Sequence, residues 1–388
     1  MLQTSVIELS RSALQKNIKF IKSQVGKNVK FSSVIKGNAY GHGIDTFVPL
    51  AEKCGIDHFS VFSADEALSA LQSRTRGSHI CIMGAIDNDE LGWAIENDIS
   101  FYIFELDRLQ AALKASQKIG KPANIHLELE TGLNRTGLQG DQLVEAVDLI
   151  KQNLKHLKVN GVCTHYAGAE SVSNYLRIKN QIEEFNSQCH WLTRRGLNIG
   201  LRHTACSAAA LSYPETRMDM VRIGIAHYGY WPSSETRMQY VLDHYRAGKN
   251  HTPDPLKRVM NWKSKVMNVK EVNPGEFVGY GTSYLTTGQQ KIASIPIGYH
   301  HGFARSLSNL GYVLIHGRRA LVVGMVNMHV VMVDVTSIKD VKKGDEVVII
   351  GKQNKAHITV GSFSDLSRFQ NYEVLARLPA IIPRVVVD

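Results

Sequence analysis

Residues 33–43 read Ser33-Val34-Ile35-Lys36-Gly37-Asn38-Ala39-Tyr40-Gly41-His42-Gly43. The apolar run at 31–35 ends at Lys36, a glycine-rich turn follows, and residues 44–54 show helical spacing of apolar side chains. This order of strand, loop and helix places Lys36 at the carboxyl end of a strand, where barrels and open α/β sheets carry their functional groups. A partly desolvated lysine there can lose its proton and attack an aldehyde as an amine. A lysine that ends a strand is more often an ordinary solvated residue, so the surrounding sequence must decide.

The first 230 residues alternate between strand-like and helix-like stretches, after a short strand at 6–9 and a helix at 10–25. Apolar runs predict strands at 31–35, 58–62, 79–83, 100–104, 124–130, 159–165, 201–207 and 220–226. Helices are predicted at 44–54, 65–71, 89–96, 106–118, 142–153 and 173–192. This pattern predicts an α/β fold, a TIM-like (β/α)8 barrel over residues 10–235. The alternative, a doubly wound sheet, needs an early glycine-rich dinucleotide turn, and the sequence contains none.

The character of the chain changes after Tyr230. Residues 231–258 are polar and read as a linker with a helix at 234–245. Short β-like segments separated by Gly and Pro turns follow, at 262–272, 290–297, 311–315, 319–323, 329–335, 345–350 and 357–360. We therefore expect a second, mainly antiparallel β domain built from residues 236–388 together with the strand at 1–9.

Composition limits the class of protein. A chain of 388 residues with 44% apolar residues suits a folded protein of two domains. The net charge of +10 is spread along the chain without a nucleic-acid motif, so an anionic small ligand or solubility explains it better than nucleic acid. The five cysteines show no metal-type spacing, so no metal site is predicted, and Cys81, Cys163 and Cys206, which lie in apolar runs, are expected to be buried free thiols. No secretion signal or membrane-spanning run is recognised, and we expect a cytoplasmic protein.

Polar residues end several predicted strands and should meet at one mouth of the barrel. They are Lys36, Glu128, Glu130, His165, His203, Ser207 and Arg222, with Arg135 just beyond the fifth strand. Each has an ordinary explanation, such as a core histidine, a helix cap or half of an ion pair. A phosphate group binds hydroxyls and backbone N–H groups, and Ser207 and the Gly224-Ile225 pair can supply both. The number of such residues at one face favours a functional site.

Three segments carry a resemblance to a known family. Residues 33–43 resemble the pyridoxal-phosphate lysine motif of the alanine racemase family, commonly Val-Lys-Ala-Asn-Ala-Tyr-Gly-His-Gly, with Gly37 in place of the first alanine. Residues 220–225 resemble its Val-Arg-Pro-Gly-Ile segment, with Ile223 in place of proline, and residues 278–284 resemble Val-Ser-Tyr-Gly-Ala-Thr-Tyr. The resemblance covers nearly the whole chain. It implies an isomerase: a pyridoxal-phosphate-dependent amino acid racemase that interconverts L-alanine and D-alanine.

The resemblance also implies how the cofactor is held. The positions that bind the cofactor phosphate match Tyr40, Ser207, Gly224, Ile225 and Tyr372. Lys36 would form the Schiff base, Arg222 would face the pyridine nitrogen, and His165 would lie beside the cofactor. Because arginine only donates hydrogen bonds, Arg222 would keep that nitrogen unprotonated and disfavour a long-lived carbanion. Barrel decarboxylases of this fold carry a glutamate there, so Arg222 argues against decarboxylation.

Racemisation needs one base on each face of the reacting carbon. The resemblance implies that Lys36 is one base and Tyr280 the other, and that Tyr280 enters from a second subunit, so the protein would be a homodimer with shared active sites. A cationic neighbour, His165 or Arg222, would lower the pKa of Tyr280. Arg135 and the backbone N–H of Met328 would bind the substrate carboxylate. Tyr299 would line the entrance, and Glu128 and His203 would support the site.

Several positions depart from the family pattern. Many members carry a carbamylated lysine where this chain has Glu128, whose carboxylate we expect to anchor the substrate arginine directly. The entrance differs at Met325, Asn327, His329, His300 and His301. A racemase of serine, of basic amino acids or of broader range therefore stays open, as does a non-catalytic pyridoxal-phosphate-binding barrel. The insert at 233–255 has no assigned role. Whether the product is a cell-wall precursor or the reaction is catabolic also stays open.

Overall fold

The computed structural model describes residues 4–248, 253–367 and 371–388. The chain divides into two compact units. One comprises Ser12–Lys36 and Val48–Lys257; the other comprises Met1–Arg11, Gly37–Phe47 and Arg258–Asp388. The chain thus passes from the first unit to the second directly after Lys36. The boundary expected between residues 235 and 236 stays a prediction.

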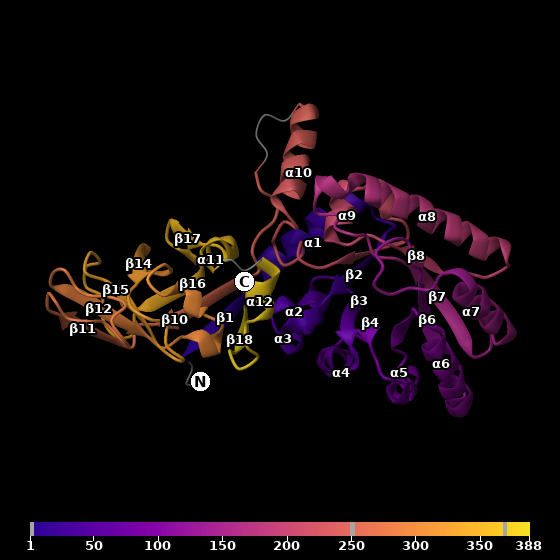
Figure 1. Cartoon of the computed structure of the whole chain (residues 1–388), viewed down its shortest axis with the longest axis horizontal. Coiled ribbons are helices and arrows are strands. Elements are labelled where there is room, and N and C mark those ends of the chain that lie inside the picture. The colour runs from indigo at the N-terminus through magenta and orange to yellow at the C-terminus, as the bar shows by residue number, and fades with distance from the viewer. Residues whose placement is uncertain (1–3, 249–252, 368–370) are drawn as a thin grey trace. The chain divides into compact units, whose positions relative to one another are not determined.

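The first unit is the predicted barrel of eight parallel strands. They are β2 (Lys30–Val34), β3 (His58–Ser63), β4 (His79–Ala85), β5 (Ser100–Ile103), β6 (Ala123–Glu128), β7 (Leu157–Cys163), β8 (Leu201–His203) and β9 (Met220–Ile223). Their order is β8-β7-β6-β5-β4-β3-β2-β9. Helices lie outside the strands (Figure 1), as repeated strand–helix units require.

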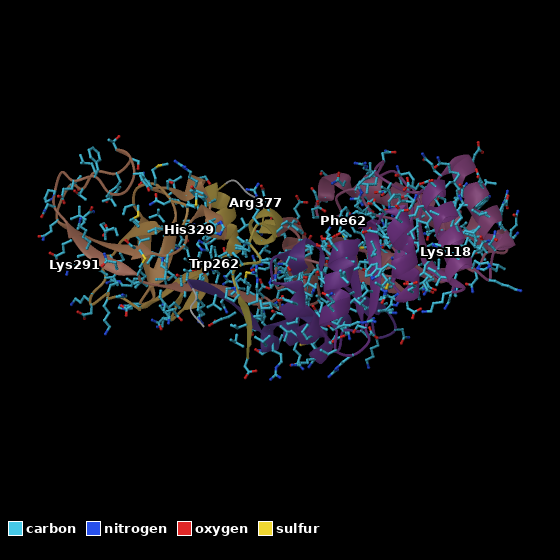
Figure 2. All side chains as sticks on the ribbon, turned by 90° about the horizontal axis from the view of Figure 1, so that it is seen from below. Phe62, Lys118, Trp262, Lys291, His329 and Arg377 are labelled. Carbon is cyan, nitrogen blue, oxygen red and sulfur yellow. The ribbon has the colours of Figure 1, made fainter. Side chains whose placement is uncertain are left out.

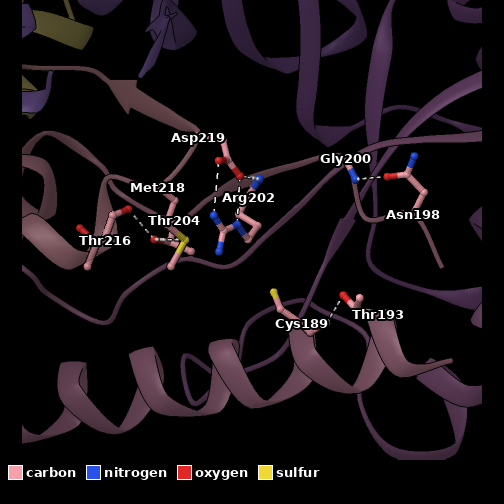
Figure 3. Close-up of polar contacts among 9 residues, drawn as sticks. All are labelled: Cys189, Thr193, Asn198, Gly200, Arg202, Thr204, Thr216, Met218 and Asp219. Carbon is pink, nitrogen blue, oxygen red and sulfur yellow. Dashed lines mark hydrogen bonds and ion pairs between the residues drawn. The ribbon is translucent and has the colours of Figure 1, made fainter. Parts of the chain in front are cut away.

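Strands β8 and β9 bring the ends of this sheet together. Asp219 N donates to Arg202 O at 3.1 Å, and Arg222 N donates to Ala205 O at 2.9 Å. The side chains of Arg202 and Asp219 form an ion pair, with Nε 3.0 Å from Oδ2 (Figure 3). Burial tends to raise the pKa of Asp219, but the hydrogen bonds from Arg202 outweigh it and lower that pKa. The barrel is therefore nearly closed.

Except for α9, which was not predicted, the helices of the chain up to residue 248 follow the predicted pattern. They are α1 (Arg11–Val25), α3 (Ile44–Lys53), α4 (Ala64–Ser73), α5 (Leu91–Glu96), α6 (Leu106–Ile119), α7 (Gly140–Gln152), α8 (Tyr175–Arg194), α9 (Ser207–Ser212) and α10 (Ser234–Arg246). Helix α6 shows why they form: Leu109, Ala112 and Ser116 are buried at helical spacing, and Gly120 ends the helix in a left-handed conformation.

Several predicted strands were too long at their carboxyl ends; the strand expected at 220–226, for example, ends at Ile223. The strand expected at 201–207 ends at His203, and Ser207 begins helix α9. The run Ala208-Ala209-Ala210 has high helix propensity, which explains the change of element.

In the insert, the helix expected at 234–245 is α10, whose first turn is capped by Ser233 Oγ accepting from Thr236 N at 3.0 Å. Residues 249–252 of the insert lie outside the described residues.

The second unit contains a mainly antiparallel ten-stranded sheet, as predicted. Its strands are β1 (Ser5–Ser10), β10 (Met260–Lys265), β11 (Asn268–Val272), β12 (Gln290–Ile295), β13 (Tyr312–Ile315), β14 (Arg318–Val322), β15 (Val331–Asp334), β16 (Glu346–Gln353), β17 (Ala356–Ile358) and β18 (Arg384–Val387). Their order is β11-β12-β15-β14-β13-β16-β10-β1-β18, and β17 pairs with β16. Helices α11 (Val360–Ser367) and α12 (Asn371–Ala376) lie between β17 and β18 in sequence.

Two features of this sheet differ from the prediction. The single strand expected at 262–272 is two strands, because the chain turns at Val266 and Met267 between β10 and β11. Strand β18 was not predicted; it pairs in parallel with β1, more than 370 residues earlier in the chain. Trp262, labelled in Figure 2, is 1% exposed and belongs to the core of this unit.

No helix among the described residues is long and apolar enough to span a membrane.

Candidate active site

Lys36 follows β2 at the carboxyl end of that strand. Ile35 N donates to Ser60 O at 2.9 Å, which extends the contact between β2 and β3 up to the lysine. Lys36 remains accessible to solvent. Burial of its amine by surrounding atoms lowers its pKa, and the positive charge of Arg135 lowers it further. A larger fraction of this amine is therefore neutral, and so nucleophilic, than for an ordinary lysine.

The turn after Lys36 is left-handed. Gly37, Asn38, Ala39 and Tyr40 have φ values of 63°, 52°, 54° and 50°. For each non-glycine residue this conformation costs about 1–2 kcal/mol. The turn is held by Gly43 N donating to Asn38 O at 2.9 Å and by Ile44 N donating to Asn38 Oδ1, also at 2.9 Å. Residues held in such a strained conformation are common at functional sites. The left-handed conformation of this turn therefore supports the functional role predicted from its sequence motif.

Two expected phosphate ligands lie together in the sheet unit. Tyr40, on the left-handed turn, is 9% exposed, and its ring centroid is 6.0 Å from that of Tyr372 on α12. The sequence places these residues more than 330 positions apart, and the fold brings their rings into contact range.

The other expected phosphate ligands lie together in the barrel unit. Ser207 Oγ accepts hydrogen bonds from Gly224 N at 3.0 Å and from Ala226 N at 3.4 Å. Because these amides occupy the lone pairs of Ser207, its own hydroxyl proton is left to donate to an anion. Ile225 follows Gly224 in the same segment and is 1% exposed.

Arg222 is buried in the barrel unit and is held by four acceptors. Its Nη1 donates to His203 Nδ1 at 2.7 Å and to His203 O, and its Nη2 donates to Thr164 O at 2.7 Å and to Thr204 O at 3.1 Å. Burial opposes its charge, but nearby Tyr102 and thiol groups raise its pKa, so it stays protonated. Within the described part of the chain these bonds all use the Nη atoms, so Nε is the donor that remains for a ligand.

The bond to Arg222 sets the tautomers of two histidines. Arginine cannot accept, so His203 Nδ1 must accept and its Nε2 carries the proton. That Nε2 lies 2.8 Å from His126 Nδ1 and donates to it. The expected supporting role of His203 is therefore consistent with a direct contact to Arg222. The role of His126 was missed; its place two residues before Glu128, on the same face of the strand, was the available signal.

Two further histidines line the interior of the barrel and were also missed. His58 Nδ1 lies 2.9 Å from Ser32 Oγ, and His79 Nε2 lies 2.8 Å from Ser100 Oγ. Burial lowers the pKa of His79 to about 4 and that of His126 to about 3. The pKa values of His58 and His203 are lowered well below the ordinary range by the same cause. All four are therefore neutral at neutral pH.

The loop that carries Arg135 is held by Glu130. Its Oε1 accepts from Gly132 N and its Oε2 accepts from Asn134 N at 2.9 Å. Gln188 Nε2 also donates to Glu130 O at 2.9 Å. Glu130 was predicted to lie at the mouth of the barrel, but no role was assigned to it. The structure shows that it shapes the loop, since its carboxylate accepts from two backbone amides.

The expected direct contact between Glu128 and Arg135 is wrong for this structure. No ion pair within 4.0 Å joins the two side chains, which are both among the described residues. Instead, Glu128 Oε2 accepts from Thr136 Oγ1 at 2.9 Å, next in sequence to Arg135. Arg135 is exposed and Glu128 is 5% exposed, so the arginine keeps its hydration while the carboxylate binds a neighbouring hydroxyl. Burial raises the pKa of Glu128.

His165 cannot act as the expected cation. Burial lowers its pKa to about 3, with the charges of Arg222, Arg135 and Lys36 acting in the same direction. It is therefore neutral at neutral pH, and the hypothesis that it lowers the pKa of a neighbouring tyrosine by its charge is wrong. Arg222 keeps its charge and can still do so.

The remaining expected residues lie in the sheet unit and are open to solvent. Tyr280 is 73% exposed, between Gly279 and Gly281, which both have positive φ. Met328 and Tyr299 are 52% and 41% exposed. Tyr299 N donates to Asn327 O and His300 N donates to Met328 O, both at 3.1 Å, which joins the two loops. In the portion of the chain that is described, no hydrogen bond uses the Met328 N–H.

Three histidines belong to these two loops. The rings of His300, His301 and His329 have centroids 4.8–5.5 Å apart. Gly298 N donates to His301 Nδ1 at 3.2 Å, so that nitrogen is an acceptor. Within residues 4–248, 253–367 and 371–388, no group of three or more His, Cys, Asp or Glu side chains is placed to hold a metal ion.

Comparison with known proteins covers the chain nearly from end to end. Residues 9–232 match the family model "Alanine racemase, N-terminal domain", and residues 259–386 match "Alanine racemase, C-terminal domain". The alanine racemase of Leptospira interrogans serovar copenhageni is 34% identical over 99% of this chain and 96% of its own length. That of Methanococcus maripaludis is 34% identical over 97% of each chain.

Solved structures agree. The alanine racemase of Bacillus anthracis with bound L-Ala-P has a TM-score of 0.89 and 28% identity, covering 100% of this chain and 96% of its own. The alanine racemase of a D-cycloserine-producing Streptomyces lavendulae has a TM-score of 0.88 and 27% identity, covering 100% and 98%. With both family models matched in order along one chain, this protein belongs to the alanine racemase family.

Proposed function

We propose that this protein is a pyridoxal-phosphate-dependent alanine racemase that interconverts L-alanine and D-alanine. The observation that carries the proposal is Lys36, an amine of lowered pKa at a strand end of the barrel, in the electrostatic field of Arg135 and Arg222. The resemblance in sequence and the named relatives supply the substrate. The alternative, an ordinary solvated lysine at a strand end, does not account for the match of residues 33–43 to the lysine motif of the family.

The residues present fit the cofactor. Ser207 keeps a hydroxyl proton for a phosphate oxygen, and Tyr40 and Tyr372 lie with their rings 6.0 Å apart. Arg222 keeps its Nε donor for the ring nitrogen, and Lys36 offers a partly neutral amine for the aldehyde. When bound, pyridoxal phosphate withdraws electrons from the substrate Cα and makes its C–H bond more acidic.

Two bases of this chain would exchange the Cα proton. Nζ of Lys36 would remove or return it on one face, helped by the lowered pKa of the amine. The phenol oxygen of Tyr280 would act on the other face. Tyr280 is 73% exposed on a glycine-flanked turn, which suits a residue that enters the site of a second copy. The proposal therefore includes a homodimer with shared active sites.

Arg222 would bias the outcome toward racemisation. Arginine only donates hydrogen bonds, so a ring nitrogen that faces it must accept and would stay unprotonated. An unprotonated ring nitrogen would draw less charge away from Cα, which would favour quick return of the proton over transamination. His203 holds the guanidinium in place through the 2.7 Å bond to Nη1.

Arg135 and the Met328 N–H would bind the substrate carboxylate. The exposed rings of His300 and His329 beside Met328 favour one second candidate, a racemase of broader specificity. Kinetics with L-serine and L-lysine beside L-alanine distinguish the two. The expected cytoplasmic location and the supply of a cell-wall precursor stay predictions.

The decisive experiment is incubation with L-alanine in deuterated water, following chirality and α-deuterium together. Formation of D-alanine with deuterium at Cα supports the proposal. Exchange without inversion would leave Tyr280 without its role, and no exchange would reject the activity. Lys36→Ala should lose the visible absorbance of bound cofactor, whereas Tyr280→Phe should keep it and lose L-to-D turnover.

A further inference from the structure

Arg384, the first residue of β18, gathers backbone carbonyls from two distant parts of the sheet unit. Its Nη2 donates to Gly41 O at 2.9 Å, and its Nε lies 3.3 Å from the same oxygen. The other acceptors, all within six residues before it, are Leu378 O at 3.3 Å, Pro379 O at 2.7 Å, Ala380 O at 3.1 Å and Ile382 O. One guanidinium thus joins the C-terminal segment 378–384 to Gly41.

Gly41 lies in the left-handed turn that follows Lys36. A Cβ at Gly41 would lie 2.0 Å from Leu375 O, and a Cβ at Gly43 would lie 3.2 Å from Arg384 Cδ. Only glycine permits this approach, and both positions have positive φ, 74° and 84°. The turn is therefore packed directly on the C-terminal part of the chain. The hydrogen bonds of Arg384 further stabilise this contact.

The turn needs such an anchor. Asn38, Ala39 and Tyr40 are held in a conformation that side chains other than glycine adopt rarely. Hydrogen bonds donated by a charged group are stronger than neutral ones, and arginine presents its donors in a rigid planar fork. A lysine offers one compact ammonium group, which cannot reach carbonyls spread from residue 378 to residue 41 in the same way.

We propose that Arg384 is a positioning residue for the cofactor phosphate. By fastening the left-handed turn to the C-terminal segment, it sets the distance between Tyr40 on the turn and Tyr372 on α12. The two ring centroids are 6.0 Å apart, close enough for both residues to contact one ligand. The inference rests on the proposed function, because the shared ligand is the phosphate of pyridoxal phosphate.

The test compares Arg384→Met and Arg384→Lys with Arg377→Met. Arg377, labelled in Figure 2, directly precedes the segment 378–384, but its ion pair with Glu373 joins side chains that are 55% and 37% exposed. In cofactor-free protein, hydrogen exchange of the peptide covering residues 37–48 should speed up in both Arg384 variants. The dissociation constant of pyridoxal phosphate should rise roughly tenfold or more, since charged hydrogen bonds to Gly41 are lost. The ³¹P resonance of the bound cofactor should shift.

Arg377→Met should match the unmodified protein in all three measurements. A residue that only stabilised the fold would lower the urea midpoint without moving the ³¹P resonance. Should Arg384→Met fail to fold, Arg384→Lys keeps the stem and charge and carries the test. Unchanged exchange, affinity and ³¹P resonance in a folded Arg384 variant would overturn the inference. Failure of the unmodified protein to bind pyridoxal phosphate would instead reject the proposed function.

Discussion

Arg222 and His203 share a hydrogen bond of 2.7 Å in which the guanidinium must be the donor. This one bond decides the tautomer of His203 and, through it, that of His126. Burial is the main cause that lowers the pKa of His203, and the positive charge of Arg222 acts in the same direction.

Replacing His203 by leucine should therefore destabilise the protein by about 1.5–3 kcal/mol, since a buried charged donor loses its acceptor. His203→Gln keeps an acceptor oxygen and should recover much of that loss. Urea unfolding of the two variants checks this. Equal stability of both variants would contradict the assignment of His203 as acceptor.

The buried histidines should make the protein sensitive to acid. Their pKa values are lowered on folding, to about 3 for His126 and about 4 for His79, whereas an unfolded histidine titrates near 6.5. Their contribution to stability is complete above about pH 6.5. As the pH falls below that value only the unfolded chain binds protons, and each histidine removes up to about 1.4 kcal/mol per pH unit.

Urea unfolding between about pH 6 and pH 5 measures this slope. His126→Gln should reduce the slope by about one proton, because glutamine does not titrate. A slope in His126→Gln identical to that of the parent would show that His126 is not buried neutral.

Glu130 should control substrate binding through the loop that carries Arg135. Its two oxygens accept from Gly132 N and Asn134 N, and glutamine can replace only one of them as an acceptor. Glu130→Gln should raise KM for alanine roughly ten- to hundredfold, because the arginine is displaced. The value of kcat should change less. Glu145→Gln, exposed on α7, is the control, and an unchanged KM in Glu130→Gln would refute this role.

The pKa of Lys36 should depend on Arg135. Burial and the charge of Arg135 both lower it, so removing that charge should raise it. In cofactor-free Arg135→Gln, the pH midpoint for modification of Lys36 by a small anhydride should move to higher pH. Peptide mass spectrometry at several pH values follows this reaction. A midpoint that stays in place or falls would mean that Arg135 does not act on the amine.

Periodicity was enough to predict most of the fold. Strands such as β3 (His58–Ser63) and helices such as α6 (Leu106–Ile119) bury one face or both. Burial of a face requires apolar residues at regular spacing, and this spacing can be recognised in the sequence. The misjudged segments lack that local signal. Strand β18 is short and forms only by pairing with β1, and Ser207 follows an apolar run but begins a helix.

The site shows the same division. The positions of Lys36 after β2 and of Arg222 in β9 could be predicted because each lies in a recognisable motif within an apolar run, whereas their roles stay predictions. The neutral state of His165 and the partner of Glu128 could not be predicted, because desolvation and hydrogen-bond choice depend on atoms from other strands.

The sequence by itself determined that this chain is a barrel followed by a β domain, with a lysine at a strand end, because those features repeat with the period of the backbone or lie in one motif. Only the tertiary structure decided which groups hold that lysine's turn and its arginines. Arg384 and Gly41 are 343 residues apart in sequence, yet Nη2 and the carbonyl oxygen are 2.9 Å apart in space. Contacts of that kind arise from folding alone, since no local pattern encodes which carbonyl a distant guanidinium will meet.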